Sequence, residues 1–152
     1  MDDWIEKMNL FFLIDTSAAM GTEIIRQLNR AMPKVLVAAE EASIEREVKL
    51  VVRIIQINSV ARYIIGNSYH GIHGCDAISL WEDLDCGGRA DTAGAIDLVL
   101  QSMHASILGG ESHPIIILIS CGRSKEPDKT IQKSMELAMA MSDRCLQKRM
   151  GL

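Results

Sequence analysis

The sequence predicts a mixed α/β fold with a mostly parallel sheet. Short apolar runs, typical of strands covered on both faces, alternate with longer segments of helical periodicity. Such alternation favours a parallel sheet. One connection between two runs is too short for a parallel crossover, so that pair must be antiparallel. The 152 residues, 48% of them hydrophobic, fit a single domain over residues 1–152 with an ordinary core.

The first strand is predicted at residues 10–14, where the chain is continuously apolar. A helix is predicted over residues 20–45, and Pro33 should kink or split it because proline removes a backbone donor and clashes one turn back. Helical spacing places one apolar stripe of this segment on the sheet. The residues of the stripe are Ile24, Leu28, Met32, Val35, Leu36 and Ala39.

Two further strands are predicted at residues 47–57 and 61–65, joined by a turn at Asn58 and Ser59. Residues 67–74 are expected to form a loop and residues 77–85 a short irregular segment. A second helix should begin after a cap at Asp91 or Thr92 and run to about residue 107. A fourth strand (114–120), a charged loop (125–129) and a last helix (130–149) complete the order β-α-β-β-α-β-α.

Composition argues against several classes of partner. The net charge is −4 and no block of Lys and Arg stands out, so nucleic acid is not expected. No stretch approaches the roughly 20 apolar residues of a membrane span, so no membrane is expected either. The N-terminus is acidic and lacks a basic-then-apolar leader, which makes the cytoplasm the default location. The four scattered cysteines are interpreted as free thiols.

The turn after the first strand is the most informative stretch. It reads Asp15, Thr16, Ser17, Ala18, Ala19 and follows an apolar run. This stretch resembles the first metal loop of von Willebrand factor A (vWA) domains, where an Asp-x-Ser-x-Ser loop holds a divalent cation. WEDLDCGGRADTAGAI (81–96) looks like the second metal loop of the family, and IIILISCG (115–122) looks like its fourth strand.

The resemblance covers roughly residues 9–124. It implies a three-layer, Rossmann-like vWA fold with a mostly parallel sheet, one antiparallel edge strand and a short C-terminal end. The Trp and Leu before the double glycine look most like the compact bacterial A domains associated with tellurium resistance.

The metal site of the family is degenerate in this sequence. Ala19 replaces the second serine, Ala90 falls about where the family has its threonine, and Cys121 takes the place of an aspartate. Asp15 and Ser17 match the pattern. A carboxylate beside a soft sulfur suits Mg²⁺ poorly, so no metal cofactor is expected. The alternative is Mg²⁺ or Mn²⁺ held by Asp15, Ser17 and Asp91; without a metal, Asp91 would cap the helix.

The sequence therefore predicts a non-enzymatic, protein-binding domain with an unidentified protein partner. The alternatives are a divalent-metal-dependent binding module in a bacterial stress or tellurium-resistance system, and a hydrolase or a thiol enzyme built on Cys121. The sequence contains no phosphate loop and no dinucleotide fingerprint. Thr16, Thr92, Ile115 and Ile117 are the candidate partner-binding residues. A bare apolar fourth strand at the sheet edge also predicts a homodimer through that edge.

Overall fold

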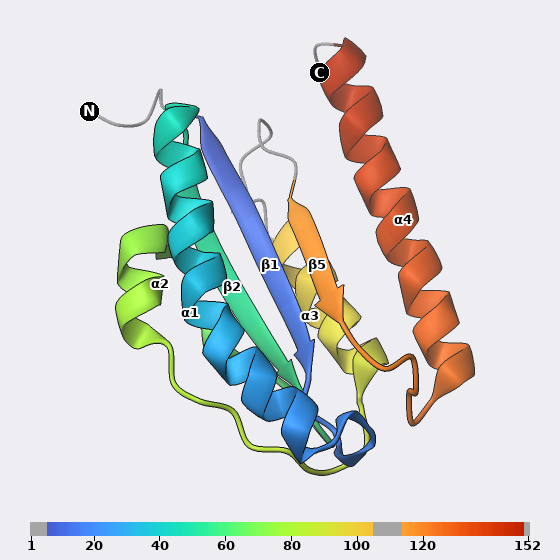
Figure 1. Cartoon of the computed structure of the whole chain (residues 1–152). Helices are drawn as coiled ribbons and strands as arrows, with labels where there is room; N and C mark the ends of the chain where they lie inside the picture. Colours follow the sequence, from blue (N-terminus) through green and yellow to red (C-terminus); the bar gives the residue numbers. More distant parts are fainter. Residues whose placement is uncertain (1–5, 105–113, 151–152) are drawn as a thin grey trace.

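The sheet is built around β1 (Lys7–Asp15), which lies between two parallel neighbours, β2 (Lys49–Ile57) and β5 (Ile115–Ile119) (Figure 1). β3 (Ala61–Ile65) pairs antiparallel with the other edge of β2, so the strand order is β3-β2-β1-β5. The computed structural model describes residues 6–104 and 114–150, with side chains up to residue 143. The predictions of a central first strand, a mostly parallel sheet and an antiparallel edge strand are confirmed.

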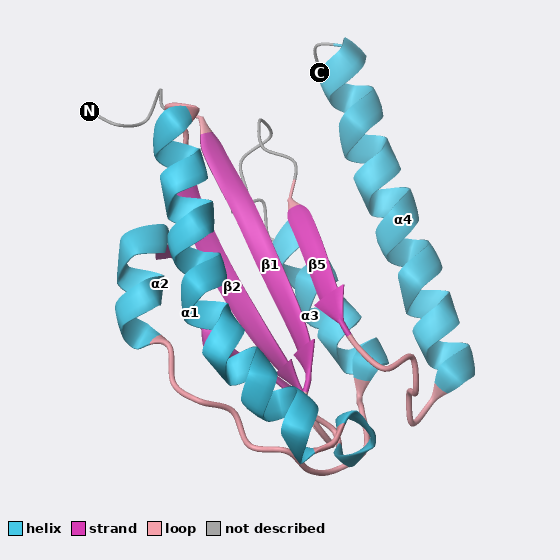
Figure 2. Cartoon of the chain, viewed as in Figure 1, coloured by secondary structure: helices cyan, strands magenta, loops and turns pink. Residues whose placement is uncertain are grey.

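Helices cover both faces of the sheet (Figure 2). α1 (Thr22–Glu45) and α2 (Gly74–Leu80) pack on one face, and α3 (Thr92–His104) packs on the other, with α4 (Pro127–Met150) beside it. A short 3-10 turn, η1 (Ala18–Met20), precedes α1. Because successive strand residues point to opposite faces, β1 supplies both cores. Leu10, Phe12 and Ile14 face α1, whereas Phe11 and Leu13 face α3.

α1 differs from its prediction in two respects. It is one continuous helix of 24 residues with Pro33 inside it, so of the two predicted effects of Pro33, a kink or a split, the split does not occur. The apolar stripe that it buries is also turned about the helix axis relative to the predicted stripe. Ile25 is buried, whereas Ile24 and Val35 are 47% and 39% exposed. Leu28 follows Ile25 by three residues and Met32 follows Leu28 by four, so these three side chains lie on one face of the helix. Ile24 lies at the margin of that face.

The segment between β3 and α3 is more regular than predicted. β4 (Ile72–His73) pairs antiparallel with β2 inside the expected loop, and α2 occupies part of the segment expected to be irregular. A two-residue strand and a seven-residue helix are too short to show periodicity in the sequence. α4 begins at Pro127, within the expected charged loop, because proline is favoured at the first position of a helix. The predicted end of the second helix, near residue 107, lies outside the described residues.

The carboxyl ends of the parallel strands meet at one end of the sheet, the lower end in Figure 1. The turn into α1, the segment before α3 and the β5–α4 loop come together there. We call this end the crest and define it as residues 15–19, 86–91 and 120–126. Within the described residues, no helix combines the length and the apolar character that crossing a membrane requires.

Candidate functional site

Backbone hydrogen bonds fix the three loops of the crest against one another. Ala18 N donates to Gly88 O at 2.9 Å and Gly87 N donates to Thr16 O at 2.8 Å. Lys125 N donates to Ala90 O at 3.0 Å. Each loop is held by main-chain hydrogen bonds as well as by its own strand or helix, so the backbone positions from which the crest side chains project are fixed.

Asp15 ties the first loop to the third. It is 0% exposed. Its Oδ1 accepts the Ser17 backbone N–H at 2.8 Å, and its Oδ2 accepts the Ser120 hydroxyl at 3.1 Å and the Cys121 thiol at 3.8 Å. Both carboxylate oxygens are therefore engaged by donors of the chain itself. Ser17 is 1% exposed, and its Oγ has no hydrogen-bond partner among the described residues.

Two of the predicted partner-binding residues lie below the surface. Thr16 is 0% exposed and its Oγ1 accepts a hydrogen bond from Gln56 Nε2 at 3.0 Å. Thr92 is 5% exposed at the first turn of α3. Both residues are buried in this structure, and their contact with a partner stays a prediction.

Asp91 acts as the N-terminal cap of α3. Its Oδ1 accepts the Gly94 backbone N–H at 3.1 Å, the bond expected between a cap and the third helical residue. Asp91 therefore has the helix-capping role that the sequence predicts for it in the absence of a metal. A Cβ at Gly94 would lie 2.3 Å from Asp91 Oδ2, so the absence of a side chain there makes room for the capping carboxylate.

The other degenerate positions supply few oxygens. Ala19 is exposed, Ala90 is 2% exposed and packs into the core under α3, and Cys121 presents an exposed thiol. Mg²⁺ demands near-octahedral oxygen ligands. Of the carboxylates proposed as ligands, Asp15 is already bonded within the crest and Asp91 caps α3, which leaves the hydroxyls of Ser17 and Ser120 beside them. Within residues 6–104 and 114–143, no group of three or more His, Cys, Asp or Glu side chains comes together. This donor set fits Mg²⁺ or Mn²⁺ poorly.

A cavity of about 550 Å³ opens on the crest beside Ser17. Among the described residues, three basic side chains line it and no Asp or Glu does; they are Arg89, Arg123 and Lys125. Sequence reasoning missed these residues because they do not form a block. The usable signal was local: Arg89 and Arg123 each follow a glycine in a crest loop. Those glycines have φ values of +76° and +82°, which few other residues adopt.

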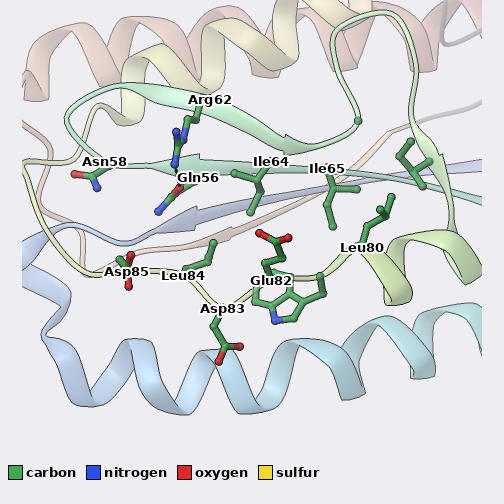
Figure 3. Close-up of a pocket in the computed structure, with 13 residues that line it drawn as sticks. Gln56, Asn58, Arg62, Ile64, Ile65, Leu80, Glu82, Asp83, Leu84 and Asp85 are labelled. Carbon is green, nitrogen blue, oxygen red and sulfur yellow. Dashed lines mark hydrogen bonds between the residues drawn. The ribbon is translucent and has the colours of Figure 1, made fainter.

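A second cavity, of about 590 Å³, lies over the α1-side face of β3 and has the opposite charge (Figure 3). Glu82, Asp83 and Asp85 line it from the segment after α2, and Arg62 lines it from β3. Arg62 donates to Gln56 Oε1 at 3.2 Å. Figure 3 shows Glu82 extending toward the strand that carries Ile64, whereas Asp83 points away from it.

The free edge of β5 and the outer face of α4 expose apolar side chains. Ile115 and Ile117 are 45% and 39% exposed on the α1 side, and Leu118 is 48% exposed on the other side. α4 packs on α3 without covering these residues; Lys133 Nζ donates to Asp97 Oδ1 at 3.0 Å, which raises the pKa of Lys133. Three exposed residues of α4 recur every fourth position. They are Ile131, Met135 and Met139.

No protein-family model and no curated protein matches the sequence. Solved structures do match the fold. A von Willebrand factor type A protein from Catenulispora acidiphila superposes with a TM-score of 0.65 over 86% of this chain, at 11% identity. The chain has a vWA-like fold. Proximal thread matrix protein 1 of the mussel byssus, solved with a zinc-occupied MIDAS motif, gives a TM-score of 0.65 over 89% of this chain, at 14% identity.

A third vWA-like match is the type V pili tip protein Mfa5 from Porphyromonas gingivalis, with a TM-score of 0.59 over 79% of this chain and 14% identity. The chain spans only 30%, 36% and 20% of the length of these three solved chains. These superpositions establish the vWA-like fold. Because the sequence identities are so low, the chemistry of the crest has to be argued from the residues that this chain places there.

Proposed function

We propose that this vWA-like domain is a non-enzymatic protein-binding module whose crest works without a bound metal. One observation carries the proposal: both oxygens of the buried Asp15 carboxylate are bonded by the chain's own donors, while a cavity lined by Ser17 opens on the crest above. A metal at this carboxylate would have to compete with those donors. The bonded carboxylate instead holds the first and third crest loops in place under a surface free to meet a partner.

Two further points support a binding role. Solved proteins with this fold include a pilus adhesin and a byssal matrix protein, which makes adhesion between proteins a reasonable extension to this chain. Within the described residues, no three His, Cys, Asp or Glu side chains gather into a group that could hold a catalytic metal ion. The exposed crest, with Ala19 on its surface, is then the surface offered to the partner.

Site-specific photocrosslinking tests this proposal. A photoreactive amino acid at Ala19 should capture a defined protein in cells of the source organism. The same residue at Arg46, exposed at the end of α1 far from the crest, serves as the matched control. The capture should persist when EDTA is added to extracts. An Ala19 adduct that is absent, or also obtained from Arg46, would contradict a binding crest; an adduct abolished by EDTA would contradict its metal independence.

The competing function is a divalent-metal-dependent binding module. The observation in its favour is the buried Ser17 hydroxyl, which lacks a partner among the described residues and matches a ligand of the vWA metal loop. Calorimetric titration with Mg²⁺ and Mn²⁺ separates the two functions. Saturable binding that is lost in Asp15→Ala would establish the metal-dependent module, and a flat titration supports the metal-free crest.

We also propose that two copies of the chain associate through β5. Pairing the free edges of two β5 strands would cover Ile115, Ile117 and Leu118, and covering a bare apolar edge avoids uncontrolled association. Light scattering should give a dimer mass for the wild type and a monomer mass for Ile117→Lys. A monomer over the whole concentration range of the wild type would contradict this pairing.

The biological setting is proposed from the sequence resemblance alone. A cytoplasmic, bacterial stress system of the tellurium-resistance type is the setting that the resemblance implies. Deleting the gene in its source organism and measuring growth in tellurite tests this setting, because unchanged growth would argue against it.

A further inference from the structure

The crest cavity has a charge that the overall composition does not suggest. The chain as a whole carries four more acidic than basic residues. The part of the chain that the structure describes nevertheless lines this cavity with two arginines and one lysine and with no acidic residue. Because like charges repel when gathered without counter-ions, such a cluster is stabilised when an anion binds.

The two arginines are free to make that contact. In the described part of the chain, Arg89 and Arg123 take part in no ion pair and donate no side-chain hydrogen bond, and both are exposed. Glu126 is the acidic residue next to Lys125 in the chain. Its Oε2 lies 3.7 Å from Lys129 Nζ, and it is not among the described residues that line the cavity. Lys125 is held in place by donating to Ser59 O at 2.8 Å.

A buried hydroxyl supplies a second, independent observation. Ser17 lines the same cavity, is 1% exposed and has no hydrogen-bond partner for its Oγ among the described residues. A buried polar group left unpaired is costly, and an anionic oxygen in the cavity would accept a hydrogen bond from the Ser17 O–H. The space beside the Gly122 Cα is open as well, since a Cβ there would meet no described atom within 4 Å, although the Gly122 N–H itself donates to Ser120 Oγ.

We infer that the crest cavity binds a phosphorylated serine or threonine side chain of the protein partner. This inference rests on the proposed function and names the chemistry recognised by the same site. A phosphate monoester carries about −1.5 to −2 charges and three strong acceptor oxygens, which match three cations and a hydroxyl better than the single charge of a carboxylate. Arginine forks bind phosphate through two parallel hydrogen bonds. The cavity of about 550 Å³ leaves room for the peptide around the phosphate.

Titration of the ¹⁵N-labelled full chain, followed by NMR in EDTA, tests the inference. The probes are degenerate peptides with a fixed central phosphoserine, matched peptides with Ser or Glu at that position, and inorganic phosphate. Phosphoserine peptides should shift the amides of Ser17, Gly88 and Gly122 and bind at least about tenfold more tightly than the Ser and Glu peptides and than inorganic phosphate.

Variants locate the effect. The double substitution of Arg89→Ala with Arg123→Ala should weaken phosphopeptide binding at least about tenfold, and Ser17→Ala severalfold. Arg46→Ala, at the other end of α1, should leave it unchanged. If the double variant loses its fold, Arg89→Lys provides the milder test, because it keeps the charge but removes the fork.

Three results would overturn the inference. Equal binding of the Glu peptides would show carboxylate recognition, and inorganic phosphate binding as tightly as the peptide would show a site for a free anion. No binding of any probe, while the Ala19 crosslink persists, would refute phosphate recognition and leave the protein-binding crest standing. Loss of that crosslink would refute the proposed function itself.

Discussion

Replacing Asp15 by alanine tests whether this carboxylate is a structural tie or a metal ligand. Asp15→Ala removes the acceptor of the buried Ser17 N–H and of the half-buried Ser120 hydroxyl. A hydrogen bond to a charged group contributes about 1.5–3 kcal/mol, and an exposed donor that can turn to water contributes less. We therefore expect the free energy of unfolding to fall by about 2–4 kcal/mol, mostly through Ser17.

Urea unfolding followed by circular dichroism measures this change, with the midpoint shifting at an unchanged slope. Asp15→Asn is the matched control. It keeps the shape of the side chain and one carbonyl oxygen for the Ser17 N–H, so we expect it to lose about half as much free energy as Asp15→Ala. A loss below about 1 kcal/mol for Asp15→Ala would show that the observed hydrogen bonds do not anchor the crest.

The same experiment in Mg²⁺ separates the structural role from the metal role. A ligand present at 100 times its dissociation constant stabilises the folded state by about 2.7 kcal/mol. If Asp15 is only a structural tie, wild-type unfolding is the same in EDTA and in about 10 mM Mg²⁺. Stabilisation of the wild type by Mg²⁺ that disappears in Asp15→Ala would refute the metal-free crest.

Three further predictions concern the surroundings of the crest and the docking of α4. Gly88→Ala should destabilise the fold by about 2 kcal/mol or more, because its φ is +76° and the new Cβ would lie 2.0 Å from an asparagine oxygen. Gly87→Ala, whose Cβ would meet nothing within 4 Å, should cost far less in the same urea titration, and equal losses would contradict the steric argument. Asp91→Ala should cost about 1 kcal/mol with or without Mg²⁺, and Asp91→Ser should restore most of it; a metal-dependent loss would instead support Asp91 as a ligand. The pKa of Lys133 is raised above its ordinary 10.5 by Asp97, so this pair stabilises the fold fully below 10.5 and ceases to do so as the pH rises through the raised pKa. Urea midpoints of the wild type and Lys133→Met should therefore converge at alkaline pH, whereas a constant difference would mean that Lys133 acts through packing alone.

Local sequence determined the larger elements of this protein. The continuous apolar run through Phe11 and Phe12 has no polar face, which is typical of a strand covered on both sides. The short connection between β2 and β3 imposed an antiparallel pair. Asp91, one of the two cap residues that the sequence predicted, caps α3, because capping depends on a residue and the backbone three positions on. These features need no information from distant parts of the chain.

Tertiary structure decided the chemistry of the crest. The bonds from Ser120 and Cys121 to Asp15 join residues more than a hundred positions apart, and no local pattern states that both oxygens of that carboxylate become engaged. The basic cavity likewise forms only when the loops of Arg89 and Arg123 are brought together by the parallel order of the strands. Sequence spacing governs contacts within an element, whereas the electrostatics of a site made by several loops depends on which strand ends the sheet places side by side.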